Sequence, residues 1–158
     1  MDDRLNETDG RPRVDQVIRT LVRHHLQGAL PEPGKPSFLA LVARHMQPGQ
    51  NQMAGPFFQT MVAPIFGTFS RALTAARPSL GPKDVSWIVA SVIGQIQHLI
   101  LRWHKRQDMV DDPESLQVML QAFPPLDLPL NDYIAQVTDH ITRFSTAAID
   151  GLYPEVTT

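Results

Sequence analysis

The spacing of the apolar residues is the feature that most constrains the fold of this chain. In the long segments these residues recur at intervals of three and four, the period of an α-helix, and no segment alternates with the period of two that a half-buried strand requires. Turns rich in glycine and proline separate the segments. The helices expected from this pattern cover about residues 13–27, 38–46, 56–76 (with a start at 52 also compatible), 82–107, 114–123 and 131–152. The sequence therefore predicts an all-α bundle of about six helices.

Prolines and capping residues refine this prediction. Pro64 lies inside the 56–76 segment, where it has no amide hydrogen to donate and its ring crowds the previous turn, so we expect a bend there. Pro82 is suited to the first position of the longest helix, which spans about 39 Å at 1.5 Å per residue. Asn131 or Asp132 is expected to cap the last helix.

Composition excludes several classes of protein. The chain has 158 residues, of which 42% are apolar, and this is enough for one domain with its own core. Only 19% of the residues are charged and the net charge is −2, so no basic surface is available to neutralise phosphates, and direct nucleic-acid contact is not expected. The lack of cysteine excludes disulfides, thiolate zinc sites and cysteine nucleophiles. With no apolar run of about 20 residues and no signal-peptide core, we expect a cytoplasmic protein without a membrane segment.

Three stretches suggest a family. They are LVARHMQPGQNQMAGPFFQTMVAPIFGTFSRAL, then SWIVASVIGQIQHLILRW with its Gly94-Gln95 pair, and DHITRFSTAAIDGL near the end. Their order and spacing resemble the C-terminal domain of TetR-family transcription regulators, in the subgroup whose C-terminal domain is similar to that of the CecR regulator. The resemblance covers about residues 35 to 152. It implies a domain at 13–153 that binds an effector and dimerises, followed by a short tail at 154–158. The polar residues before that domain, with Gly10 and Pro12 as breakers, predict an N-terminal arm at 1–12.

The resemblance also implies a function. Members of the family are ligand-responsive repressors, and their helix-turn-helix domain precedes the part matched here, so this chain alone is not expected to contact an operator. A cloned fragment, a misassigned start and a natural truncation all fit that arrangement. The alternative is an interaction module without an effector, which would heterodimerise with a full-length regulator.

A ligand site is expected in the middle of the bundle for a small apolar or aromatic effector. Polar Gln95 and His98 lie in an otherwise apolar run, where an unpaired polar group would cost roughly 1 to 3 kcal/mol if buried. A bound ligand would pair with them, although a water or a neighbouring side chain would serve as well, and the aromatic residues could be ordinary core. The expected lining is Phe57, Met61, Phe66, Trp87, Gln95 and His98.

A homodimer interface is expected on the last two long helices, because each has more apolar or small-residue surface than one partner covers. The expected residues are Ala90, Gly94, Ile134, Val137, Ile141, Phe144 and Ala148. The alternative is a monomer in which both faces are internal.

No cofactor, metal site or catalytic site is predicted. No two of the six histidines are three or four residues apart, the spacing that helical metal ligands need, and no serine lies in a nucleophile-elbow motif. We therefore do not expect an enzyme. The basic residues Arg102, His104, Lys105 and Arg106 lie at the end of the long helix, where cations are favourable beside the negative end of the helix dipole.

Overall fold

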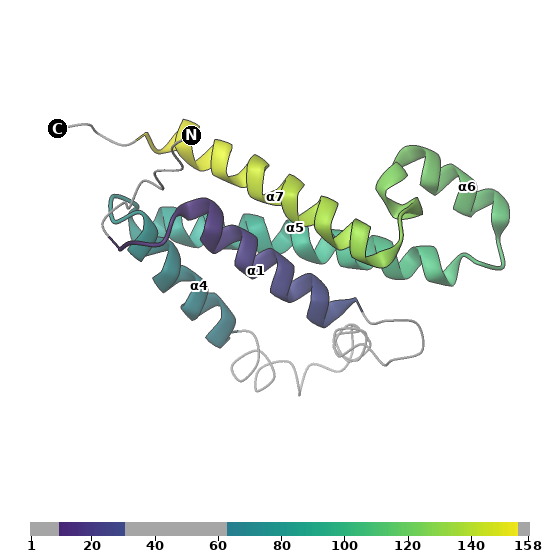
Figure 1. The fold of residues 1–158 in the computed structure, drawn as a ribbon, viewed down its shortest axis with the longest axis horizontal. Coiled ribbons are helices and arrows are strands. Elements are labelled where there is room, and N and C mark those ends of the chain that lie inside the picture. The colour runs from purple at the N-terminus through teal and green to yellow at the C-terminus, as the bar shows by residue number, and fades with distance from the viewer. Residues whose placement is uncertain (1–9, 31–62, 155–158) are drawn as a thin grey trace, which may run out of the picture.

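The computed structural model describes residues 10–30 and 63–154, and all regular structure in these ranges is helical (Figure 1). The elements are α1 (Val14–Ala29), α4 (Ala63–Ala76), α5 (Pro82–Asp108), α6 (Pro113–Ala122), the 3-10 helix η2 (Pro124–Asp127) and α7 (Leu130–Leu152). The all-α prediction is confirmed. The described residues contain five α-helices instead of the expected six, because the segment predicted at 38–46 lies outside them. The bend predicted at Pro64 depends on residues before 63, which also lie outside the described part.

Helix α1 supplies the centre of the core. Its amide at Arg13 donates to the side-chain oxygen Oε1 of Gln16 at 3.3 Å, which satisfies one group at the start of the helix. Ile18, Val22 and Leu26 follow at intervals of four and are fully buried. Burial of each such aliphatic side chain stabilises the fold by about 1.5 to 3 kcal/mol. Helix α1 packs against α7, α4 and α5.

The most extensive pairing in the bundle joins α1 to α7. Thr138 and Thr142 are buried on α7, and small side chains of this kind allow two helices to approach closely. The Thr142 hydroxyl donates to the Thr138 carbonyl at 2.7 Å, so its burial does not leave it unpaired. At the edge of the pairing, the Arg19 guanidinium donates to Asp139 at 3.0 Å, and this bond lowers the pKa of the Asp139 carboxyl.

Helices α5 and α7 run antiparallel and are joined at both ends (Figure 1). At one end the Tyr133 hydroxyl donates to the Leu99 carbonyl at 2.9 Å, and the rings of Tyr133 and Trp103 lie 4.5 Å apart between centroids. Burial raises the pKa of Tyr133 to about 12. At the other end the buried guanidinium of Arg77, in the turn that leads from α4 into α5, donates to Asp150 and to the carbonyl of Tyr153. These contacts fix which half of α5 lies beside which half of α7.

Helix α5 follows the predicted bounds closely, with Gly81 before it and Pro82 at its first position. By length and apolar composition it is the one described helix that could cross a membrane, but the core helix of a soluble protein passes the same test. Eight of its residues are buried against the rest of the chain. These residues are Val85, Ile88, Val89, Val92, Ile93, Ile96, Ile100 and Trp103.

The start of α7 differs from the prediction. The helix begins at Leu130, directly after Pro129, so Asn131 and Asp132 lie in its first turn and neither caps it. Proline fixes a backbone angle that suits a helix start, which explains the earlier beginning. Asp132 still has a favourable place, since the positive end of the helix dipole lies in this turn.

Helix α6 projects from the end of the bundle and packs against η2 (Figure 1). Its first turn is capped by Asp112, whose carboxylate accepts from the amide of Ser115 at 3.2 Å, and this bond lowers the pKa of Asp112. None of its residues is buried. The helix therefore depends on its cap and on local contacts more than on the core.

Candidate functional site

Of the residues expected to line a ligand pocket, those that the structure describes do not all lie inside the chain. Phe57 and Met61 lie outside the described residues. Phe66 is partly buried against the core, and Gln95 is half-buried, with its amide donating to the Ser91 carbonyl at 3.3 Å. The two other candidates, Trp87 and His98, lie on the surface, Trp87 with 64% of its side chain exposed. The prediction that these two line an interior pocket of one chain is therefore wrong.

Helix geometry gives the reason. Val85 and Val89 are buried, and Trp87 lies two residues from each, which is about 200° around the helix. His98 lies about 20° from Trp87 by the same arithmetic, since it follows eleven residues later. Its imidazole Nε2 accepts from Nε of Arg102 at 2.7 Å, so its partner is a surface side chain of its own helix. The part of the ligand prediction that concerns Phe57, Met61, Phe66 and Gln95 stays a prediction.

The residues expected at a dimer interface divide into two sets. Ile134, Val137 and Ile141 are 7%, 3% and 0% exposed within the single chain, so their assignment to an interface between chains is wrong. They face the intrachain core, where α7 packs against α1 and α5. The other set stays accessible. Ala90, Gly94 and Phe144 are exposed, and Ala148 is half-buried.

The exposed side of α5 forms a continuous surface, which we call the outer face. It comprises Trp87, Ala90, Gly94, His98 and Leu101. Leu101 is 57% exposed and was missed as a candidate, although it lies seven residues after Gly94, in line with it on the helix. A Cβ added at Gly94 would meet no atom within 4 Å. The outer face therefore has a large apolar side chain at each end and free space beside Gly94 at its middle.

Helix α7 carries a large exposed apolar side chain, Phe144. Phe144 follows Tyr133 by eleven residues, which places it about 20° from Tyr133 and so on the side of α7 that turns toward α5. Its side chain is 59% exposed, and its ring stacks on His140 with centroids 6.3 Å apart. Because α5 and α7 are antiparallel, this half of α7 lies beside the half of α5 that carries Trp87 (Figure 1).

The two arginines near the end of α5 each lie over an aromatic ring of the same chain. The Arg102 guanidinium lies 5.4 Å above the Phe123 ring, and the Arg106 guanidinium lies 4.8 Å above the Trp103 ring. Cation–π contacts of this kind contribute about 0.5 to 1 kcal/mol at exposed sites. The Arg102 contact therefore joins α5 to the end of α6, whereas the Arg106 contact lies within the last turns of α5.

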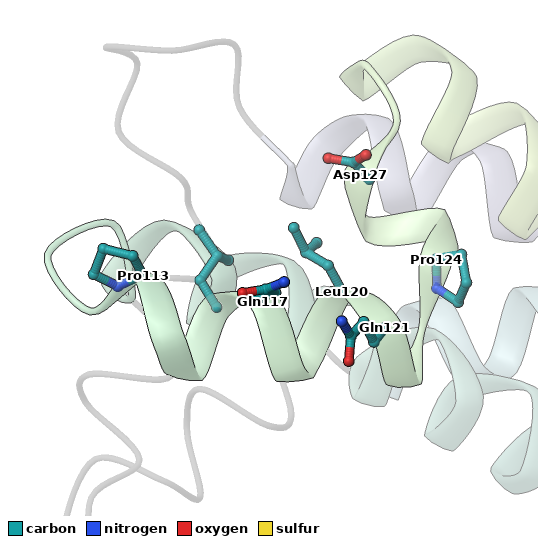
Figure 2. Close-up of a pocket in the computed structure, with 7 residues that line it drawn as sticks. Pro113, Gln117, Leu120, Gln121, Pro124 and Asp127 are labelled. Carbon is teal, nitrogen blue, oxygen red and sulfur yellow. The ribbon is translucent and has the colours of Figure 1, made fainter.

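A hollow of about 440 Å³ lies between α6 and η2, open to solvent on one side (Figure 2). Its lining is Pro113, Leu116, Gln117, Leu120, Gln121, Pro124 and Asp127, and it includes none of the predicted ligand residues. Its polar groups come from two glutamines and one aspartate. Within residues 10–30 and 63–154, no three histidine, aspartate or glutamate side chains are grouped as metal ligands.

The hollow does not combine these groups with a buried charge or an enclosed apolar wall, so the outer face of α5 is the stronger candidate for function. Comparison with protein-family models, with curated proteins and with solved structures gave no significant match to this chain.

Proposed function

We propose that this chain is a dimerisation domain of the TetR type, the C-terminal half of a ligand-responsive transcription regulator, and that two copies join through the outer face of α5 and the exposed half of α7. The observation that carries the proposal is the exposure of Trp87 and Phe144 at the same end of the two longest helices. Single exposed apolar residues are ordinary in folded proteins. Large apolar side chains gathered on neighbouring helices are typical of an interaction surface.

The charge pattern of α5 supports the same proposal. No lysine, arginine, aspartate or glutamate occurs between Asp84 and Arg102. A charge buried in an interface must be paired or it costs several kcal/mol. Covering the outer face with a second protein therefore buries no formal charge, whereas the exposed sides of α1 and α7 carry Arg19, Asp139 and Arg143.

The effector part of the proposal depends on the resemblance to the family. Phe57, Met61, Phe66 and Gln95 remain as its candidate lining. The outward positions of Trp87 and His98 favour the alternative, an interaction module without an effector that heterodimerises with a full-length regulator. Both versions use the same surface for association.

Phe144→Glu tests the association. Because Phe144 is exposed in the single chain, the substitution should leave the fold intact and place a charge in the interface, so light scattering should report a monomer where the unmodified chain is a dimer. Val118→Glu is the matched control, since Val118 is 63% exposed but lies on α6. It should remain a dimer. An unmodified chain that is monomeric at tens of micromolar would contradict the proposal.

A thermal-shift screen with apolar and aromatic compounds separates the two versions. A ligand that binds the folded chain raises its melting temperature with the logarithm of its excess over the dissociation constant. A shift that persists in the Phe144→Glu monomer would support an effector site within one chain. A dimer that no compound in the screen stabilises would favour the interaction module.

A further inference from the structure

We infer that the two copies meet through α5 as an antiparallel pair whose two-fold axis passes beside Gly94, so that Trp87 of one copy faces Leu101 of the partner subunit. The inference rests on the proposed dimerisation and adds the orientation and register of the two helices. It gives Trp87 a role in association, in place of the ligand-binding role expected from the sequence.

The outer face is symmetric about Gly94. Trp87 lies seven residues before it and Leu101 seven residues after it, which is about 10.5 Å in each direction along the helix. Ala90 and His98 lie four residues away on either side. In an antiparallel pair with a two-fold axis across the helices, each residue meets the partner's residue at the same distance on the other side of the axis. The pattern therefore pairs the two most exposed apolar side chains of the face with each other.

Gly94 has no side chain, so it suits the position at which the two helices come closest. A Cβ there would project into open space in the single chain, so the glycine is not needed for packing within the chain. Two backbones that cross at such a position can approach closely, and this brings the flanking side chains of both copies into contact. The sequence thus has its smallest residue at the centre of the face and its largest near the ends.

The crossing angle follows from which row of residues makes the contact. Trp87, Gly94 and Leu101 repeat every seven residues, and such a row keeps in contact when two helices cross at about 20°. Ala90, Gly94 and His98 form a row with intervals of four, which would favour a crossing of about 50° in the opposite sense. That arrangement would leave the exposed tryptophan and leucine uncovered. The shallow crossing buries both.

Charge favours the antiparallel over the parallel orientation. The last turn of α5 carries Lys105 and Arg106. A parallel pair would bring the two basic ends together and align the two helix dipoles side by side. The antiparallel pair instead places each basic end beside the partner's first turn, whose Lys83 and Asp84 carry no net charge together, and it opposes the dipoles.

Single cysteines test the register, since the chain has no native cysteine. A disulfide forms only where the two Cα atoms approach within about 7 Å. Under mild oxidation, Gly94→Cys alone should give a covalent dimer. An equimolar mixture of Trp87→Cys and Leu101→Cys should give the mixed dimer, identified by its mass, in large excess over either self-linked product. Val118→Cys on α6 is the control and should not cross-link.

The outcomes distinguish the register from the dimerisation itself. Self-linking of Trp87→Cys without the mixed product would indicate a parallel pair and would overturn the inference. A dimer by light scattering in which none of the α5 cysteines cross-links would also overturn it; the proposed dimerisation would stand, but its contact would lie elsewhere than on the outer face of α5. A monomeric unmodified chain would overturn both.

Tryptophan fluorescence of the unmodified chain is an independent readout. Trp103 is 3% exposed and should emit alike in monomer and dimer, whereas Trp87 should move from a covered to a wet environment on dissociation. The inference predicts a red shift on dilution through the dissociation seen by light scattering. Dissociation without a change in emission would contradict the burial of Trp87.

Discussion

Replacing Gly94 with alanine should have opposite effects on folding and on association. In the interior of an exposed helix, alanine is more favourable than glycine by about 1 kcal/mol. The added methyl would meet no atom within 4 Å in the single chain, so nothing in the structure offsets this gain. We therefore expect the monomer to become more stable by about 1 kcal/mol, a shift of about 3 °C in melting temperature for a chain of this size.

Association should respond in the opposite direction, because two methyl groups, one from each copy, would occupy the closest approach of the helices. Overpacking at such a contact costs about 1 to 3 kcal/mol, which corresponds to a dimer dissociation constant roughly 5 to 150 times higher. The measurement is urea unfolding at submicromolar protein and again at tens of micromolar. Gly94→Ala should exceed the unmodified chain in stability at the low concentration and lose that advantage at the high one.

Gly28→Ala is the control for this experiment. Gly28 is exposed near the end of α1, and a Cβ there also meets no atom within 4 Å. It should change stability by a similar or smaller amount at both concentrations, without any effect on association. If Gly94→Ala behaves in the same way, with an unchanged dissociation constant, then Gly94 does not lie at a contact between copies.

Three further predictions concern the fold. Leu26→Ala removes a fully buried side chain and should lower the free energy of unfolding by about 2 to 5 kcal/mol in urea titrations, whereas an exposed control such as Val118→Ala should change it little. Burial lowers the pKa of His25 below 6.5, with a smaller contribution from His24, although the hydrogen bond to the Leu21 carbonyl raises it. Because the fold favours the neutral ring, the stability that it contributes should be full above pH 6.5 and should fall as the pH drops through the lowered pKa. His25→Gln should reduce that loss between pH 7 and 5, and equal slopes for both chains would contradict the assignment. The pKa of Tyr133 is raised from 10 to about 12, so its protonated hydroxyl stabilises the fold below pH 10 and this stability is lost as the pH rises toward 12. Tyr133→Phe should lower the free energy of unfolding by about 1 kcal/mol at neutral pH and should reduce the loss of stability at alkaline pH.

The bounds of the helices could be predicted where proline and glycine mark them. Helix α5 starts at Pro82 as expected and ends one residue beyond the prediction, at Asp108. Helix α6 starts at Pro113, one residue early, because proline fits the first helical turn. The cap of α7 was misplaced, since Asn131 and Asp132 are good capping residues but Pro129 already fixes the start. Local signals therefore placed the bounds of these three helices to within one or two residues.

The candidate ligand site was less predictable, because apolar character does not specify the direction of a side chain. Trp87 and His98 were grouped with the interior on the strength of their residue types and the apolar run around them. The positions of Val85 and Val89, one on each side of Trp87, already require it to point the other way once those two are buried. A helical wheel drawn around the valines would have placed both candidates on the outer face. Polar Gln95, half-buried and bonded to its own helix, needs no ligand to satisfy it.

The interface on α7 was misplaced for a different physical reason. The stripe of Ile134, Val137 and Ile141 has the periodicity of a helix seam, and this periodicity is the same whether the partner is a helix of the same chain or of another. Within one chain, however, a partner helix is tethered, so its effective concentration exceeds that of a second copy in dilute solution. The strongest apolar stripes are therefore covered inside the chain first, here largely by α1 with its fully buried Ile18 and Val22. A second copy can use only what the intrachain packing leaves exposed.

The outer face has the properties expected of a surface that the packing within one chain leaves exposed. It is narrower than the stripe on the core side of α5, and it has one glycine and one alanine between its two large apolar side chains. Alone it buries too little for a stable interface, which needs about 800 Å² on each partner. Phe144, exposed on the neighbouring half of α7, would add to the surface that a second copy covers. If the outer face of α5 is the centre of the dimer, then Phe144 lies at its margin, and Phe144→Glu should weaken association less than Trp87→Glu does. Light scattering across a dilution series measures both dissociation constants, and the reverse order would move the two-fold axis from α5 to α7.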